Sequence, residues 1–262
     1  METGEVSRLD FCYRKVNITK LKELKYTLVD MHVHTTCSDG LASPEEIIKR
    51  AGKLGIGIAV TDHNSISGVE EVFSNDLDIL VIPGIEIKTK KGLHMLFYFY
   101  TLKELKRFFN ANKSNIISNN FSLIGCRKVP EKYKCIWALP HPCGFEPWDN
   151  WKKNLHGEDS DYLIKGLHAF EVINGYSTKI QSKESYRIAK ANHKGLTGGS
   201  DAHKLKDIGN VLTCSKEKDI ESFLAAVINR QTRVIGKHSS ITRNYFVQQL
   251  VRIKKSFINS TQ

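Results

Sequence analysis

The chain of 262 residues is 40% apolar and 26% charged, an ordinary globular composition that fits one large α/β domain or two small ones. Its longest apolar run, residues 93–102, is too short to cross a bilayer, and its charged start argues against a signal peptide, so we expect no membrane partner. The net charge of +11 favours a polyanionic partner such as nucleic acid, although a solvated basic surface would explain the charge equally well. The six cysteines include no CxxC pair, which fits a reducing, cytoplasmic environment.

Apolar runs typical of strands alternate with helical patterns along the chain, which predicts a repeating βα architecture. The clearest helix runs from Ser43 to Leu54, because Ser43 can cap it, Pro44 suits its first turn and Gly55 ends it. The expected strands cover residues 26–29, 56–60, 77–82, 93–100, 135–139, 168–173, 195–198 and 210–213. Further helices are expected at 65–74, 102–120, 179–192, about 216–229 and 241–258.

The stretch from Asp30 to Gly40, DMHVHTTCSDG, stands where the first of these strands ends. Side chains alternate along a strand, so Asp30, His32 and His34 are expected on one face. Two imidazoles and a carboxylate suit a divalent metal, with Asp30 accepting a ring N–H from one of the histidines. A single His-x-His pattern is more often one buried and one exposed histidine than a metal site. A metal site is therefore predicted only if similar fragments occur further along the chain.

Such fragments follow at the ends of later strands, where active sites of βα barrels are built. Six of the ten histidines stand at such ends: His32, His34, His63, His94, His141 and His203. Together with Asp39, Glu86 and Asp201 they supply nine nitrogen and oxygen ligands, enough for more than one metal. The absence of cysteine from this set favours a catalytic site over a closed structural one.

The fragments HVHTTCSDG, TDHN, GIE, LPHP and GSDAH, with the strand that holds His94, resemble the motif set of the polymerase and histidinol phosphatase (PHP) family of metal-dependent phosphoesterases. The resemblance runs in order from Asp30 to about Thr213. It implies an α/β fold, a distorted (β/α)7 barrel, with metals at the carboxyl end of the strands. We expect one such domain over residues 1–262, with its motif core at 26–214 and a basic amphipathic helix at about 239–258.

The resemblance also implies three divalent ions, of Mn²⁺, Zn²⁺ or Fe²⁺. One would be held by His32, His34, Glu86 and Asp201, a second by Glu86, His94 and His141, and a third by Asp39, His63 and His203. Four of these residues are expected to be catalytic: Asp39, His63, Glu86 and His203. A hydroxide bridging two ions would attack the phosphorus, so no nucleophilic side chain is required.

Three functions remain open at this point. The first is hydrolysis of a phosphomonoester, either a small metabolite or a nucleotide. The second is a nuclease or exonuclease acting on short single-stranded RNA or DNA, which the basic excess and the aromatic residues Trp148, Trp151 and Tyr176 favour. The third, a non-catalytic metal-binding accessory module, is disfavoured because no ligand position is missing.

Two stretches bear on the substrate. Asp39 in its SDG turn resembles the nucleotide-phosphatase and exoribonuclease-like branch of the family, whereas the histidinol phosphatase branch generally carries a histidine there. The loop at residues 143–157 directly follows His141, so it is expected to overhang the metals and to select the substrate.

Overall fold

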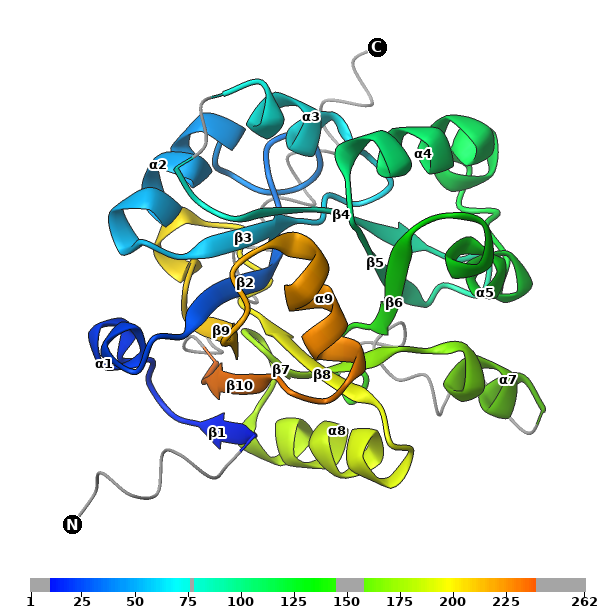
Figure 1. Cartoon of the computed structure of the whole chain (residues 1–262). Helices are drawn as coiled ribbons and strands as arrows, with labels where there is room; N and C mark the ends of the chain where they lie inside the picture. Colours follow the sequence, from blue (N-terminus) through cyan, green and yellow to red (C-terminus); the bar gives the residue numbers. More distant parts are fainter. Residues whose placement is uncertain (1–9, 76–77, 145–157, 239–262) are drawn as a thin grey trace.

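Ten strands form one continuous sheet in the computed structural model, which describes residues 10–75, 78–144 and 158–238 (Figure 1). The order of the strands across the sheet is β1-β10-β9-β2-β3-β4-β5-β6-β7-β8. Their bounds are β1 Phe11–Tyr13, β2 Thr27–Val33, β3 Gly57–Val60, β4 Val81–Lys88, β5 His94–Phe99, β6 Cys135–Leu139, β7 Ala169–Asn174, β8 Gly195–Gly199, β9 Val211–Ser215 and β10 Arg233–Gly236.

The seven strands from β2 to β8 neighbour one another in chain order and curl into a distorted barrel. Its two edges meet just beyond β8, where the backbone N–H of His34 donates to the carbonyl of Ala202 at 3.1 Å and the N–H of Ala202 donates to His32 at 3.3 Å. The distortion comes from β5, which runs antiparallel to both β4 and β6. The predicted fold, a distorted α/β barrel of this type, is confirmed.

Helices cover the outside of this sheet, except α9, which lies across one end of the barrel (Figure 1). Their bounds are α1 Ile18–Glu23, α2 Pro44–Leu54, α3 Ser67–Phe73, α4 Leu102–Ile117, α5 Leu123–Lys132, α7 Glu158–Gly166, α8 Lys179–Ala191 and α9 Ile220–Ile228. The helix predicted after Ser43 is confirmed with its capping box: the Ser43 hydroxyl accepts from the Glu46 N–H, the Glu46 carboxylate accepts from the Ser43 N–H, and Gly55 ends the helix at a φ of 61°. None of the described helices is both long and apolar enough to span a membrane.

Among the described residues, the buried apolar side chains form two cores. The inner core lies between the strands, with Met31 and Leu96 among its members, and α9 closes it by adding Phe223, Leu224 and Val227. The outer core lies between the sheet and the remaining helices. Each large side chain buried in this way stabilises the fold by about 1.5–3 kcal/mol.

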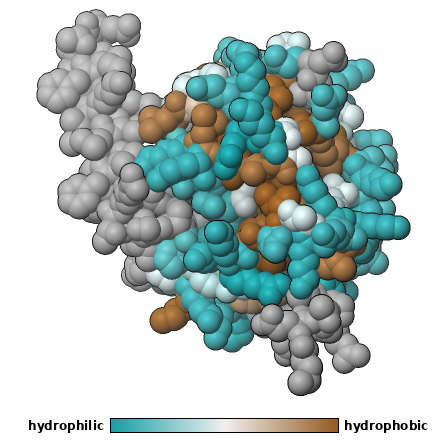
Figure 2. All heavy atoms as spheres, turned by 90° about the vertical axis from the view of Figure 1, so that its left-hand side faces the viewer, coloured by the Kyte–Doolittle hydropathy of each residue, from teal (hydrophilic) through white to brown (hydrophobic). Residues whose placement is uncertain are grey.

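The side of the molecule that carries α1 and α2 is shown in Figure 2. Hydrophilic residues cover much of this face, and hydrophobic residues gather in a band near its middle. Apolar atoms contribute more than half of the surface of an ordinary folded protein, so a band of this kind does not by itself mark a binding site.

One predicted strand needs correction here, and several elements were not predicted. The strand expected at residues 77–82 is β4, which runs from Val81 to Lys88 and therefore passes through Pro83 and Gly84 instead of ending before them. Antiparallel pairing with β5, from Gly84 opposite Tyr98 to Lys88 opposite His94, carries the strand past the proline. The elements β1, α1, α5, α7 and β10 were not predicted, because they are short or lack a clear hydrophobic period.

Two further predictions fall on parts of the chain outside the described residues. These are the C-terminal helix expected at about 239–258 and most of the loop expected to overhang the metals, residues 145–157 with Trp148 and Trp151.

Candidate metal centre

A β-bulge in β2 determines which side chains enter the site. Val29 and Met31 both belong to the inner core, whereas Val33 packs in the outer one, and the register with β3 shifts between Asp30 and Val33. Strict alternation would place Met31 and Val33 on one face, so the bulge reverses the alternation between them. His32 and His34 therefore lie together at the mouth of the barrel, without Asp30.

Asp30 is buried elsewhere, and its predicted contact with a histidine ring is wrong. Its carboxylate accepts from the Ser200 N–H at 2.7 Å, the Ser200 hydroxyl at 2.6 Å and the Gly209 N–H at 2.8 Å. Burial raises the pKa of Asp30 to about 6 in spite of these hydrogen bonds. Its contacts hold the segment after β8 against β2.

Glu86 on β4 lies at the middle of the site and is 1% exposed. Its Oε2 lies 3.1–3.4 Å from ring nitrogens of three histidines: His32, His34 and His63. Its Oε1 lies 3.3 Å from ring nitrogens of two others, His94 and His141. The two oxygens of one carboxylate thus contact different imidazoles, as a bridging ligand would, and ligand atoms of His63, Glu86 and His94 also lie within 4.8 Å of one another.

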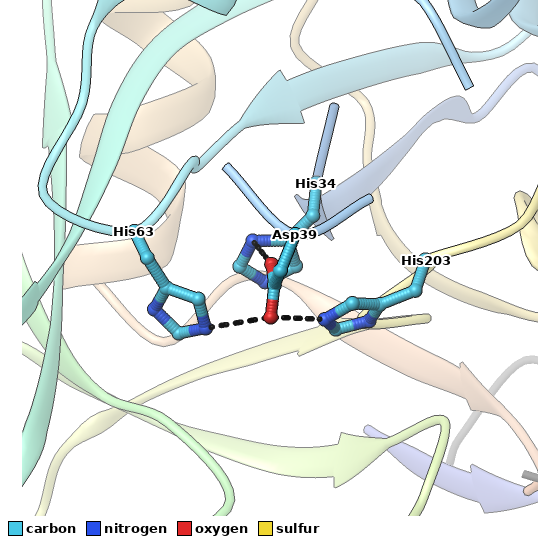
Figure 3. Close-up of side chains that lie close together, drawn as sticks. All are labelled: His34, Asp39, His63 and His203. Carbon is cyan, nitrogen blue, oxygen red and sulfur yellow. Dashed lines mark ion pairs between the residues drawn. The ribbon is translucent and has the colours of Figure 1, made fainter. Parts of the chain in front are cut away.

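Asp39 is at the middle of a second group, shown in Figure 3 with His34, His63 and His203 around it. Asp39 Oδ2 lies 3.2 Å from His203 Nε2 and 3.7 Å from His63 Nε2, and Asp39 Oδ1 lies 3.6 Å from His34 Nδ1. One ligand atom from each of the four residues falls within 4.8 Å of the others. His34 therefore touches both groups, whereas the sequence analysis assigned it to one ion only.

Asp201 completes the Glu86 side of the site. Its Oδ1 lies 3.1 Å from His34 Nε2 and 3.5 Å from His32 Nε2. The close approach of β8 to β2 requires Gly199, since a Cβ there would lie 2.3 Å from the Cβ of His32. All nine predicted ligand residues are thus brought together at the mouth of the barrel.

Two of these residues have unusual backbone conformations. His141 and Asp201 adopt φ values of 31° and 52°, in the region that residues other than glycine avoid. Such conformations cost on the order of 1–3 kcal/mol each and cluster at functional sites. Their occurrence at two ligand positions is consistent with a backbone shaped for the site and not for stability.

The carboxylates of the site stay ionised. Burial raises the pKa of Glu86 and Asp201, but the neighbouring imidazoles outweigh burial and hold both pKa values well below the usual range. Burial lowers the pKa of His63 to about 3, against the attraction of Glu86 and Asp39. Ionised carboxylates and a neutral imidazole are the protonation states that metal coordination needs. Burial lowers the pKa of His32, but the charges of Asp201, Glu171 and Glu86 outweigh burial and raise this pKa well above the usual value. His32 must therefore lose a proton when a metal binds.

Two carboxylates that support the ligands were not predicted from the sequence. Asp62 accepts from the N–H and the hydroxyl of Thr35, both at 2.7 Å, and so fixes the turn that carries Asp39. Glu171 on β7 contacts His32 Nδ1 at 3.0 Å. The sequence did contain a signal for both: Glu171 stands within an apolar strand, and Asp62 follows shortly after another. An acidic residue is rarely buried at such a position unless its carboxylate has a partner.

The donor set fits divalent transition metals, which take imidazole and carboxylate ligands. His34 Nδ1 is a buried atom without a hydrogen-bond partner among the described residues, and it faces Asp39. Buried polar atoms are normally satisfied, so an unpartnered ring nitrogen inside a ligand cluster is evidence for a coordinated ion. The residues present therefore fit the metal ions that the sequence analysis expected.

Metal binding at the Asp39 group is expected to depend on pH. Burial lowers the pKa of His203, but its hydrogen bond to Asp39 and the charges of Asp39 and Asp201 outweigh burial and raise the pKa to about 9. A coordinating imidazole must lose its proton, so affinity should rise with pH up to that value, by at most about tenfold per unit. Calorimetric titration with Mn²⁺ at about pH 6.5 and about pH 8.5 measures this. An affinity at this group that does not change with pH would contradict the prediction.

The sequence is similar to a known protein family along most of its length. The sequence model of the PHP domain matches residues 30–239 of the chain. The 5'-3' exoribonuclease Rnm of Salmonella typhimurium is 39% identical over 75 residues, which cover 26% of this chain and 26% of that protein. The matched stretch thus spans about a quarter of that relative.

Solved structures share the fold at low identity. A two-domain protein from Bacteroides vulgatus, described as containing a predicted PHP-like metal-dependent phosphoesterase, aligns with a TM-score of 0.62 and 20% identity over 81% of this chain and 66% of that one. The lesion-specific endonuclease PfuEndoQ from Pyrococcus furiosus aligns with a TM-score of 0.63 and 17% identity over 80% of this chain and 57% of that one.

Proposed function

The chain belongs to the PHP domain family, and from that premise we propose that it is a metal-dependent phosphoesterase, with the nine residues around Glu86 and Asp39 as its metal ligands. The observation that carries the proposal is the position of Glu86, which is buried and contacts five of the histidines, with different histidines on each oxygen. Bound divalent ions would supply a water of lowered pKa and would neutralise the charge on the phosphoryl oxygens.

The residues of the chain have separate roles in this proposal. Glu86 holds the two histidine groups at a fixed spacing, and Asp201 anchors His32 and His34 from the opposite side. The Asp39 group lies beside them through His34 and would bind a further ion at the edge of the site. Three ions, if bound in this way, would surround one phosphoryl group.

No side-chain nucleophile is assigned, and the two serine hydroxyls adjacent in sequence to Asp39 and Asp201 support this. The Ser200 hydroxyl is buried and donates to Asp30, and the Ser38 hydroxyl donates to Asp62. Both hydroxyls are thus held by supporting carboxylates. A solvent-derived nucleophile is the simpler alternative.

Two kinds of substrate are compatible with this chemistry. A phosphomonoester, either a small metabolite or a nucleotide, needs only the metal ligands. A short single-stranded RNA or DNA is favoured by the similarity to proteins described as 5'-3' exoribonucleases and by the net charge of +11. We therefore carry exonuclease activity as the second candidate.

A substrate screen with the purified protein tests both candidates. The protein would be loaded separately with Mn²⁺, Zn²⁺ or Fe²⁺ and given nucleoside monophosphates, nucleoside bisphosphates and short RNAs labelled at either end. Release of phosphate alone supports the phosphatase, and release of nucleotides from one end supports the exonuclease. Absence of both with every metal would contradict the proposed function, and an inactive Glu86→Gln control excludes a contaminating enzyme.

A further inference from the structure

Glu171 is a buried carboxylate that none of the assigned ligand positions includes. It lies on β7 two residues after Ala169, a member of the inner core, so its side chain points into the barrel. The register between β7 and β8 shifts immediately after it, between Glu171 and Ile173. It is 1% exposed, and a carboxylate buried to this extent is kept only where its oxygens are satisfied.

Three donors satisfy these oxygens, and all belong to the metal centre or its loops. Glu171 Oε1 lies 3.0 Å from His32 Nδ1. Glu171 Oε2 accepts from the backbone N–H of His141 at 2.8 Å and from Asn174 Nδ2 at 2.9 Å. Each contact fixes a different part of the site.

The contact with His32 fixes its tautomer. Glu171 Oε2 already accepts two N–H groups, and a carboxylate only accepts hydrogen bonds, so we assign the proton of the contact with Glu171 Oε1 to His32 Nδ1. The other nitrogen, Nε2, faces Glu86 and Asp201 at 3.3 and 3.5 Å. The lone pair used for coordination is thereby directed to the ligand cluster.

The second oxygen fixes two loops. It holds the N–H of His141, whose backbone has the unfavourable φ of 31°. It also orients Asn174, whose amide reaches Asp201 Oδ2 at 3.2 Å and whose Oδ1 accepts from the Tyr176 N–H at 2.8 Å. Through these bonds one carboxylate is connected to ligands on β2, after β6 and after β8.

We propose that Glu171 is a positioning residue that fixes the tautomer of His32 and the placement of His141 and Asp201, and so sets the metal affinity of the centre. This inference rests on the proposed metal-dependent function, because it assumes that these residues bind metal. It does not require any particular substrate.

Glu171→Gln is the informative change because it keeps the size and alters only the hydrogen-bonding capacity. A glutamine has one acceptor oxygen and one amino group, and the amino group must then face a donor. If the oxygen keeps His141 and Asn174, the amino group faces His32 Nδ1 and favours the tautomer protonated on Nε2, which cannot coordinate. We expect Mn²⁺ affinity to fall by about 10–100-fold, the range typical of such supporting carboxylates.

Two readouts test this without any substrate. Calorimetric titration measures Mn²⁺ affinity, and long-range ¹H–¹⁵N spectra of the protein loaded with diamagnetic Zn²⁺ report which nitrogen of His32 carries the proton. Glu171→Asp keeps an acceptor-only side chain and should recover part of the affinity, whereas Glu131→Gln, an exposed residue on α5, should change neither readout. Thermal unfolding of each variant excludes a folding defect.

Wild-type affinity in Glu171→Gln, or a His32 protonated on Nε2 in the Zn²⁺-loaded wild-type protein, would overturn the positioning role. Suppose that the wild-type protein binds Mn²⁺ but hydrolyses no phosphoester, and that Glu171→Gln binds Mn²⁺ more weakly. That result would overturn the proposed function and support the positioning role. The two failures are therefore distinguishable.

Discussion

Replacing Glu86 with glutamine is expected to abolish hydrolysis and to lower the bound metal while leaving the barrel folded. The glutamine keeps one acceptor oxygen, and its amino group would face ring nitrogens that a metal needs as ligands. Both groups of histidines lose their shared partner, because Oε1 and Oε2 of Glu86 serve different groups. The apolar cores do not include Glu86, so the secondary structure should persist.

Elemental analysis after gel filtration gives the metal content, and the substrate screen gives the rate. We expect the rate to fall by more than about 100-fold, because this change removes a ligand and not merely its support. Circular dichroism provides the control for folding. Full metal occupancy combined with normal turnover would show that Glu86 does not bridge metals.

The placement of the ligands could be predicted because it depends on a local rule. Polar fragments that end consecutive strands of a βα barrel meet at one face, so His32, His63 and Asp201 could be grouped from sequence alone. His94 stands at the start of a strand and not at its end. Because β5 runs antiparallel to its neighbours, the start of β5 lies at the same end of the barrel as the ends of β4 and β6.

The supporting residues could not be predicted, because they depend on tertiary contacts and local irregularities. Period-2 alternation placed Asp30 beside His32, and the bulge in β2 removed it from the site. Glu171 is separated from His32 by 139 positions, and no local pattern connects them. The role assigned to Asp30 is thus filled by a residue from across the barrel, which a strand pattern does not reveal.

The Asp39 group allows one ion to be tested separately from the others. Asp39→Asn and His203→Ala remove ligands whose contacts are with His34, His63 and Asp201, while the contacts of Glu86 with His32, His94 and His141 stay intact. Both variants are therefore expected to keep metal on the Glu86 side and to lose it at the Asp39 group.

Turnover should fall by about 100-fold or more in both variants, because an ion at this edge of the site would stabilise the leaving oxygen or the phosphoryl charge. His34 touches both groups, so a small loss of affinity on the Glu86 side is also expected. Metal content per chain, measured beside the rate and compared with the exposed control Glu131→Gln, separates the two effects. If both variants lost metal at the Asp39 group but retained the wild-type rate, that ion would be structural, and hydrolysis would be assigned to the Glu86 side alone.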